Sequence, residues 1–250
     1  MIDKKNKNII NFAFLSGNML KIIAAIAMTV DHVGVVIFPR MTILRIIGRI
    51  AFPIFAFMIA EGCRYTKNKL KYFLCVFGTA TICQVVYTIY SQRLYMSILV
   101  TFSISILLVY ALQYMKKTLR STTAEYGEKL LSWFIFFFGV VAAFVLNLFV
   151  EIDYGFIGCM LPVLASIFES EKDLFGFLKR VNINFIRILT FGIGLVFLVL
   201  YSGGVMHYAL LSLVPLLLYS GKRGKLKLKY FFYIFYPAHL LIINGISMVI

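Results

Sequence analysis

Two titratable residues, Asp31 and His32, lie side by side in residues 22–38, a run that has no other charged or titratable side chain. The next apolar run carries Arg49 and, near its far end, Glu61. A fixed charge in hydrocarbon costs about 2.5–3.5 kcal/mol on insertion scales, so such groups normally face a polar partner or a cavity. Acidic, basic and imidazole groups at these positions can move protons and stabilise developing charge, so chemistry is expected here.

The elements that carry these residues must be membrane helices. Of the 250 residues, 62% are hydrophobic and 14% are charged, whereas a soluble domain is about half apolar and a quarter charged. We therefore expect one all-α, polytopic transmembrane bundle over residues 19–250, preceded by a basic segment over residues 1–18. The four cysteines lie in or beside apolar runs without a C-x-x-C pair, so we expect reduced core residues and no metal site.

Apolar segments that approach the ~20 residues needed to cross a bilayer follow one another along the chain. The pattern predicts about nine spans, of which the sixth and eighth are short. Pro53 lies inside the second span and predicts a kink there. The predicted spans are 19–38, 43–63, 72–90, 94–115, 130–150, 154–168, 183–201, 205–219 and 230–249.

The net charge of +15 comes from basic residues that are spread unevenly among the loops. Most of the 25 basic residues fall on one set of alternating loops, and the other set holds only Arg40, Arg45 and Arg93. Lys and Arg mark the cytoplasmic side, so the sequence predicts a multi-pass protein of the cytoplasmic membrane, with its N-terminus inside and its C-terminus outside. The charge is thus explained by topology, and nucleic acid is not an expected partner.

Depth places two of the charges together. Asp31 is seven residues from the outer end of the first span and Arg49 six from the outer end of the second, roughly 10 and 9 Å at 1.5 Å per residue. Because consecutive spans are antiparallel, this matching depth predicts an Asp31–Arg49 ion pair. The pair is consistent with an active site and with a purely structural link between two helices.

His32 adds an imidazole that helix packing alone does not require, and it is a plausible base or proton relay. Adjacent residues point about 100° apart on a helix, so Asp31 and His32 must face different surroundings, one a helix partner and the other a cavity. His239 lies midway along the last span, two residues after Pro237, where a loosened helix favours a polar cavity.

The loop 221–225 holds three cations and two glycines on the predicted cytoplasmic face. Lys222, Arg223 and Lys225 could bind phosphates, and Glu61 and Arg64 lie at the same face. The loop lacks the spacing of a Walker motif. It could equally obey the positive-inside rule or contact anionic lipids.

Three blocks together resemble the TraX family of multi-spanning membrane proteins. They are residues 20–34 (LKIIAAIAMTVDHVG), 45–62 (RIIGRIAFPIFAFMIAEG) and 215–240, which ends in FYPAHL. The middle of the chain matches loosely, mainly through DYGFIG at 153–158. The family is named for a protein that acetylates the N-terminus of conjugative pilin, and it is distantly similar to transmembrane acyltransferases.

This resemblance implies transfer of an acetyl group from cytoplasmic acetyl-CoA to an amine or hydroxyl at or across the membrane. The acceptor would be a protein N-terminus or an envelope glycan or lipid. His32 would be the base, Asp31 would orient the site, Arg49 would support it electrostatically, and His239 would be a second catalytic group. The basic loop would hold the CoA phosphates. A proton-coupled transporter and a non-catalytic, pilus-associated membrane factor remain alternatives.

Overall fold

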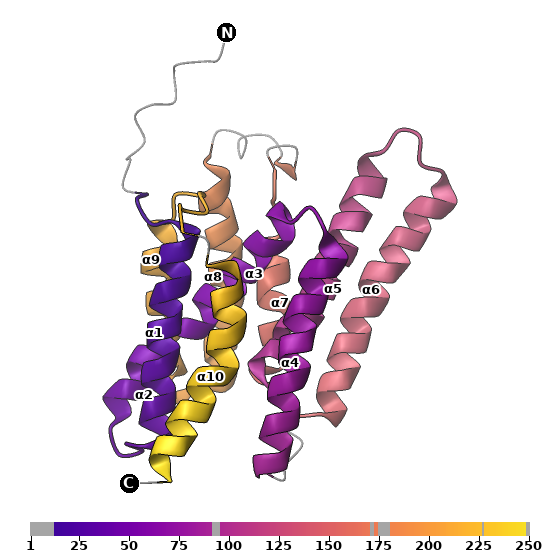
Figure 1. The fold of residues 1–250 in the computed structure, drawn as a ribbon. Helices are drawn as coiled ribbons and strands as arrows, with labels where there is room; N and C mark the ends of the chain where they lie inside the picture. Colours follow the sequence, from indigo (N-terminus) through magenta and orange to yellow (C-terminus); the bar gives the residue numbers. More distant parts are fainter. Residues whose placement is uncertain (1–12, 92–95, 171–172, 175–180, 227, 249–250) are drawn as a thin grey trace.

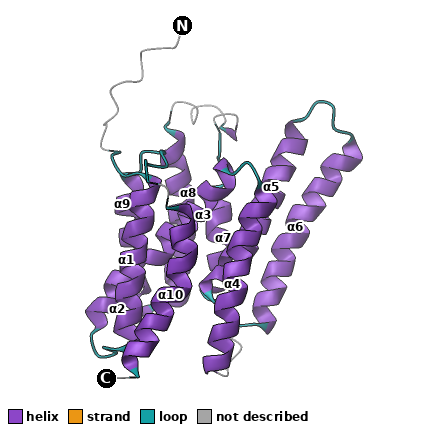
Figure 2. Cartoon of the chain, in the orientation of Figure 1, coloured by secondary structure: helices purple, strands orange, loops and turns teal. Residues whose placement is uncertain are grey.

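The computed structural model describes residues 13–91, 96–170, 173–174, 181–226 and 228–248, and within these ranges the chain forms helices and no β-strand (Figures 1 and 2). Lys4, Lys5 and Lys7 of the predicted basic segment lie outside the described residues, as does Arg93. The helices in order are α1 (Gly17–Val36), α2 (Thr42–Gly48), α3 (Ala51–Tyr65), α4 (Lys69–Ser91), α5 (Ile98–Arg120), α6 (Tyr126–Phe149), α7 (Gly155–Ala165), α8 (Ile183–Ser202), the 3₁₀ helix η4 (Gly204–Ser212), α9 (Leu213–Leu217) and α10 (Lys229–Ser247).

Each of the nine predicted segments contains helix, and the all-α prediction is confirmed. Five stretches in the described part of the chain are long and apolar enough to cross a membrane: α1, α2 with α3, α5, α6 and α8. Three apolar helical stretches are shorter, among them the sixth and eighth predicted spans. Nine crossings and the orientation of the termini stay predictions.

The second predicted span is two helices rather than one kinked helix. It breaks at Arg49 and Ile50, between α2 and α3, several residues before the expected kink at Pro53. Pro53 lies in the first turn of α3, where a backbone N–H has no intrahelical partner, so proline begins this helix without distorting it. The break changes the direction of the chain between α2 and α3, and α2 packs against α1.

The eighth segment begins as nine residues of 3₁₀ helix and ends as five residues of α-helix. A 3₁₀ helix rises about 2.0 Å per residue against 1.5 Å in an α-helix, so the two pieces together extend about 25 Å. A segment that looks short in sequence therefore runs most of the height of the bundle.

Helices α1 and α10, far apart in sequence, lie side by side and begin at the same end of the bundle (Figure 1). The loop before α10 closes the start of α1, because the backbone carbonyls of Lys222 and Arg223 accept hydrogen bonds from the N–H groups of Gly17 (2.8 Å) and Asn18 (3.0 Å). We call this the basic end, since the loops that it holds are those richest in Lys and Arg.

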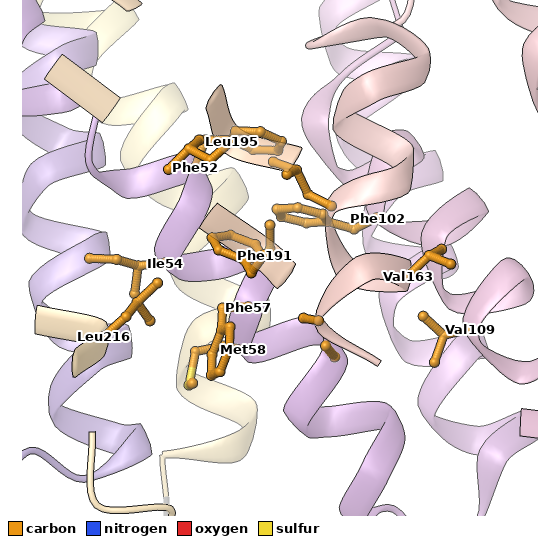
Figure 3. Close-up of a cluster of buried hydrophobic side chains, with 14 of the residues drawn as sticks. Phe52, Ile54, Phe57, Met58, Phe102, Val109, Val163, Phe191, Leu195 and Leu216 are labelled. Atoms are coloured by element: carbon orange, nitrogen blue, oxygen red, sulfur yellow. The ribbon is translucent and has the colours of Figure 1, made fainter. Parts of the chain in front are cut away.

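The apolar core joins the middle of the bundle. Phe52, Ile54 and Phe57 of α3 contribute fully buried side chains, and Phe191 of α8 meets Phe57 edge to face with ring centroids 5.5 Å apart (Figure 3). Helix α3 is thus held from several sides. Helix α6 differs, because it packs mainly on α5 and leaves most of its apolar surface outward, as expected of a helix that faces lipid.

Candidate functional site

The predicted ion pair between the first two segments forms. Arg49 donates from Nη2 to Asp31 Oδ1 over 2.8 Å, and Arg45 Nε lies 3.4 Å from the same oxygen. Helices α1 and α2 meet closely because Gly48 has no side chain: a Cβ there would lie 2.2 Å from the Asp31 Cβ. One carboxylate therefore holds two guanidinium groups together in this cluster.

Sequence reasoning missed Arg45, which it had assigned to an external loop. The signal was present, because Arg45 and Arg49 are four residues apart and such residues lie on the same face of a helix. Arg45 also has a side chain one-third exposed, against 12% for Arg49, so it forms the outer edge of the cluster.

The two membrane-depth histidines contact each other. Nδ1 of His32 lies 2.8 Å from Nε2 of His239, and Nδ1 of His239 lies 2.9 Å from the carbonyl oxygen of Phe235. A carbonyl only accepts, so Nδ1 of His239 donates, and a neutral His239 accepts at Nε2. Nδ1 of His32 is then the donor between the rings. The lone pair of a neutral His32 therefore lies on Nε2.

Asp31 and His32 face different neighbours, as their adjacency predicted. Asp31 meets the arginines of the α2 region, and His32 meets α10. His32 nevertheless follows Asp31 directly in α1 and so lies next to the cluster that Asp31 forms with Arg45 and Arg49. The imidazole pair thus lies in the field of a cluster with one negative and two positive charges.

A second charged cluster lies nearer the basic end. The Glu61 carboxylate forms a short hydrogen-bonded ion pair with Nη1 of Arg187, and it accepts a 2.6 Å hydrogen bond from the Tyr219 hydroxyl. Arg187 is fully buried, donates from Nε to the Ala165 carbonyl over 3.0 Å, and lies over the Phe57 ring. An ionised carboxylate only accepts, so the Tyr219 hydroxyl is the donor in that contact.

Arg187 lies near the start of α8 and its side chain is in the core, so it differs from the exposed basic residues of the loops. Arg64 lies 3.7 Å from the Glu61 carboxylate, a weak contact between residues one helical turn apart. Glu61 is therefore largely satisfied by protein partners.

A cavity of about 600 Å³ runs through the bundle. Five helices surround it, and each packs against the next in the order α1, α10, α4, α5 and α3. Apolar and aromatic side chains form most of its wall, including Met28, Phe55 and Phe102. Several of its polar residues, among them all of its charged ones, lie near the basic end: Asn18, Lys21, Glu61, Thr66, Tyr219 and Arg223.

Of the residues predicted to bind a cofactor, Arg223 and Glu61 line this cavity. Lys222, Lys225 and Arg64 are not among its lining residues, and both lysines are exposed. The loop bends through Gly221 and Gly224, whose φ angles of 72° and 91° favour glycine. That bend turns carbonyls, not amides, toward α1.

Lys21 and Asn18 of α1 line the cavity, although the sequence analysis did not single them out. Lys21 lies one turn inside α1, lines the cavity, and makes no ion pair within the ranges that the structure describes. Its ammonium lies 5.9 Å from the centre of the Phe232 ring. Together with Arg223 it makes the mouth of the cavity positive.

The cavity leads toward the imidazole pair. Phe235 and Tyr236 line it, and their rings lie 5.1 and 5.5 Å from that of His239, centroid to centroid. Lys21 and His32 are eleven residues apart on α1, about 16 Å at 1.5 Å per residue. The cations at the mouth and the imidazole pair are thus separated by the apolar part of the cavity wall, and neither histidine is among the lining residues.

Cys63, Cys75, Cys83 and Cys159 are free thiols. Among the described residues, no group of three or more His, Cys, Asp or Glu side chains could hold a metal ion. The chemistry that can be read from this site is proton transfer by imidazole and stabilisation of charge by arginine.

These features define a polytopic helical membrane protein with an Asp–Arg cluster and a His–His pair beside the residues that line an internal cavity. The sequence matches the profile of the family described as TraX protein over residues 16–247, and the chain belongs to the TraX family. A protein of Rickettsia prowazekii (strain Madrid E), described as uncharacterized protein RP591, is 31% identical over 159 residues, which cover 62% of this chain and 56% of that relative. No solved structure matches the chain.

Proposed function

We propose that this protein is a membrane-embedded acetyltransferase that moves an acetyl group from acetyl-CoA to an amine or hydroxyl. The observation that carries the proposal is the cavity with cations at its mouth and an oriented imidazole pair beyond its apolar wall. Phosphates of the donor would meet Lys21 and Arg223, and the thioester arm would extend along the apolar passage. Apolar walls exclude the water that would hydrolyse the thioester.

His32 is the base in this proposal. Its Nε2 removes the proton as the acceptor nitrogen or oxygen attacks the thioester carbonyl, the C–S bond breaks, and the proton passes to the departing thiolate of CoA. His239 holds the His32 ring through the Nδ1–Nε2 hydrogen bond, in the way that an orienting residue supports a catalytic base. Arg45 and Arg49 leave the Asp31 cluster with net positive charge, which favours a developing oxyanion.

Nε2 of His32 is also the atom that would carry the acetyl group if transfer proceeded through an acyl-histidine. Both routes use the same ring orientation. Family membership associates the chain with pilin-related membrane proteins, so a protein N-terminus is one class of acceptor. An envelope glycan or lipid is the other, and the proposal covers both.

A proton-coupled transporter is the second candidate, because the same cavity and titratable pair would suit an inward-open carrier. The two differ in what acetyl-CoA does. A transporter binds and moves its substrate unchanged, whereas an acetyltransferase releases free CoA and leaves an acetylated product.

The test uses the full chain in lipid nanodiscs with acetyl-CoA labelled in the acetyl group. The proposal expects saturable binding and, with membranes from cells that lack the protein as acceptor source, a labelled product and free CoA. Mass spectrometry of cells with and without the protein should show a +acetyl change. Absence of both binding and product, with substrate flux driven by a proton gradient in proteoliposomes, would establish the transporter instead.

A further inference from the structure

The mouth of the cavity carries an aromatic ring on which no other described ring stacks. Tyr65 is the last residue of α3, lines the cavity and is 60% exposed. The Arg64 guanidinium lies over its ring, 5.1 Å from the centre. Phe235, deeper in the same wall, differs because its ring stacks on those of Phe231 and His239. Tyr65 therefore keeps an open ring surface at the place where a ligand enters.

Tyr65 lies nearer the basic end than the two cations of the mouth. A Cβ on Gly17 would lie 3.7 Å from the Met58 sulfur, so these two residues lie at one level of the bundle. Tyr65 is seven residues beyond Met58, which places it roughly 10 Å nearer the basic end. Lys21 is four residues beyond Gly17, roughly 6 Å deeper. Arg223 lies between these levels, because its carbonyl accepts a hydrogen bond from the first turn of α1.

The directions of the two helices turn Tyr65 and Lys21 toward each other. A side chain on a helix leans toward the N-terminus of that helix. Helix α3 ends at the basic end, so Tyr65 leans into the cavity, whereas α1 begins there, so Lys21 leans back toward the mouth. The Lys21 ammonium accordingly lies 5.9 Å from the ring of Phe232, near the start of α10. From the mouth inward the cavity thus presents an aromatic ring, two cations and then an apolar wall.

We propose that Tyr65 stacks on a purine base, so that the acetyl donor is a thioester that carries a nucleotide. The inference rests on the proposed acetyl transfer and distinguishes acetyl-CoA from an acetylated phosphopantetheine arm without adenosine. Adenine, phosphates and the thioester arm follow one another in acetyl-CoA in the order of the ring, the cations and the apolar wall. Every base has a π face, so stacking on Tyr65 needs no further hydrogen-bond partner.

The test removes the ring and the base in turn. The full chain in lipid nanodiscs is titrated with acetyl-CoA and with acetyl-phosphopantetheine, which keeps a phosphate and the thioester arm but has no adenine. Tyr65→Leu should weaken acetyl-CoA binding about tenfold, because a stacking contact is lost, and leave acetyl-phosphopantetheine binding unchanged. Tyr65→Phe keeps the ring and should bind both as the wild type does. Tyr126→Leu, at an exposed tyrosine that begins α6 and does not line the cavity, is the matched control and should change neither affinity.

A wild type that binds the two thioesters equally, or a Tyr65→Leu variant with wild-type affinity for acetyl-CoA, would overturn the inference. Equal losses in Tyr65→Leu and Tyr126→Leu would also overturn it and make both tyrosines anchors at the membrane interface. Titration with ADP separates the base site from the reaction. If the wild type transfers no acetyl group but binds ADP, and Tyr65→Leu weakens that binding, the base site stands and the proposed function fails. If acetyl transfer proceeds and ADP binds without regard to Tyr65, the proposed function stands and the base site fails.

Discussion

The two charged clusters of this bundle are built from similar parts and differ in how completely those parts are used. In one, Glu61 pairs with Arg187 and Tyr219, and the side chains of Glu61 and Arg187 are 6% and 0% exposed. In the other, Asp31 pairs with Arg49 and Arg45 at 17%, 12% and 33% exposure. The first is closed around its carboxylate, whereas the second is partly open and lies beside two imidazoles.

Burial of charge therefore does not by itself identify the reactive site. A buried pair whose carboxylate is satisfied stabilises one arrangement of helices, although Nη2 of Arg187 is buried without a hydrogen-bond partner among the described residues. The Asp31 cluster has one cation more than its carboxylate balances, and the adjacent His32 retains a lone pair on Nε2. We assign structure to the first cluster and chemistry to the second, and the predictions below test that division in order of their expected effect on stability.

The largest loss should come from Arg187→Met, which leaves the Glu61 carboxylate buried without its main partner. Breaking a buried pair by removing one member costs about 3–5 kcal/mol. Chemical denaturation of the purified protein in detergent measures the change. Arg64→Met is the control, and its loss should stay within about 1 kcal/mol because that contact is long and more exposed. An Arg187→Met protein as stable as the wild type would contradict the structural role.

Asp31→Asn should lower the unfolding free energy by less, about 2 kcal/mol. Its two arginines are left facing each other, but the loss is limited because Arg45 can turn toward the surface. Acetyl transfer should also be lost. Adding Arg49→Gln should recover part of the stability and none of the activity. The same denaturation curves, run beside the transfer assay, test both statements, and full activity in Asp31→Asn would remove this cluster from the site.

His32→Ala should leave unfolding free energy within about 1 kcal/mol, since no charge is stranded, and reduce transfer about 10²–10⁴-fold as expected for a lost general base. His239→Ala should be milder because Nε2 of His32 is still present. His207→Ala, at an exposed histidine near Gly204, is the matched control and should be fully active.

Initial rates of acetyl transfer for the three histidine variants give the order. An active His32→Ala with an inactive His239→Ala would move the base to α10. Activity in both would exclude the mechanism.

Hydropathy predicted the helical class, because a bilayer leaves the backbone few other ways to satisfy its hydrogen bonds. Depth along the helices predicted the Asp31–Arg49 pair, because the rise per residue is fixed. The break at Arg49 was not predicted. Pro53 suggested a kink at its own position, whereas the importance of Gly48 shows only when Asp31 of the neighbouring helix is packed against it. The contact between His32 and His239 joins segments 207 residues apart, which periodicity cannot connect.

The basic loop shows what charge clustering in sequence leaves open. The cluster predicted that Lys222, Arg223 and Lys225 bind phosphates, which stays a prediction; in the structure Arg223 lines the cavity together with Lys21, and Lys222 and Lys225 do not. Lys21 and Arg223 are 202 positions apart, so the sequence alone does not show that they line the same cavity. Sequence proximity was a poor guide to which cations share a surface.

The smallest effect on stability and a large effect on binding should come from Lys21→Gln with Arg223→Gln. Neither residue holds a described ion pair, so replacing them strands no partner, while each lost contact with a phosphate weakens binding about tenfold or more. Lys222→Gln with Lys225→Gln removes the same charge from the exposed part of the loop and should leave acetyl-CoA affinity unchanged. Isothermal titration of both double variants with acetyl-CoA in nanodiscs compares them directly.

If the loop pair weakens binding and the cavity pair does not, the donor phosphates lie outside the cavity, and the passage from its mouth to His32 has another use. If only binding to vesicles of anionic lipid falls in the loop pair, those lysines contact the membrane, as the positive-inside pattern alone would suggest.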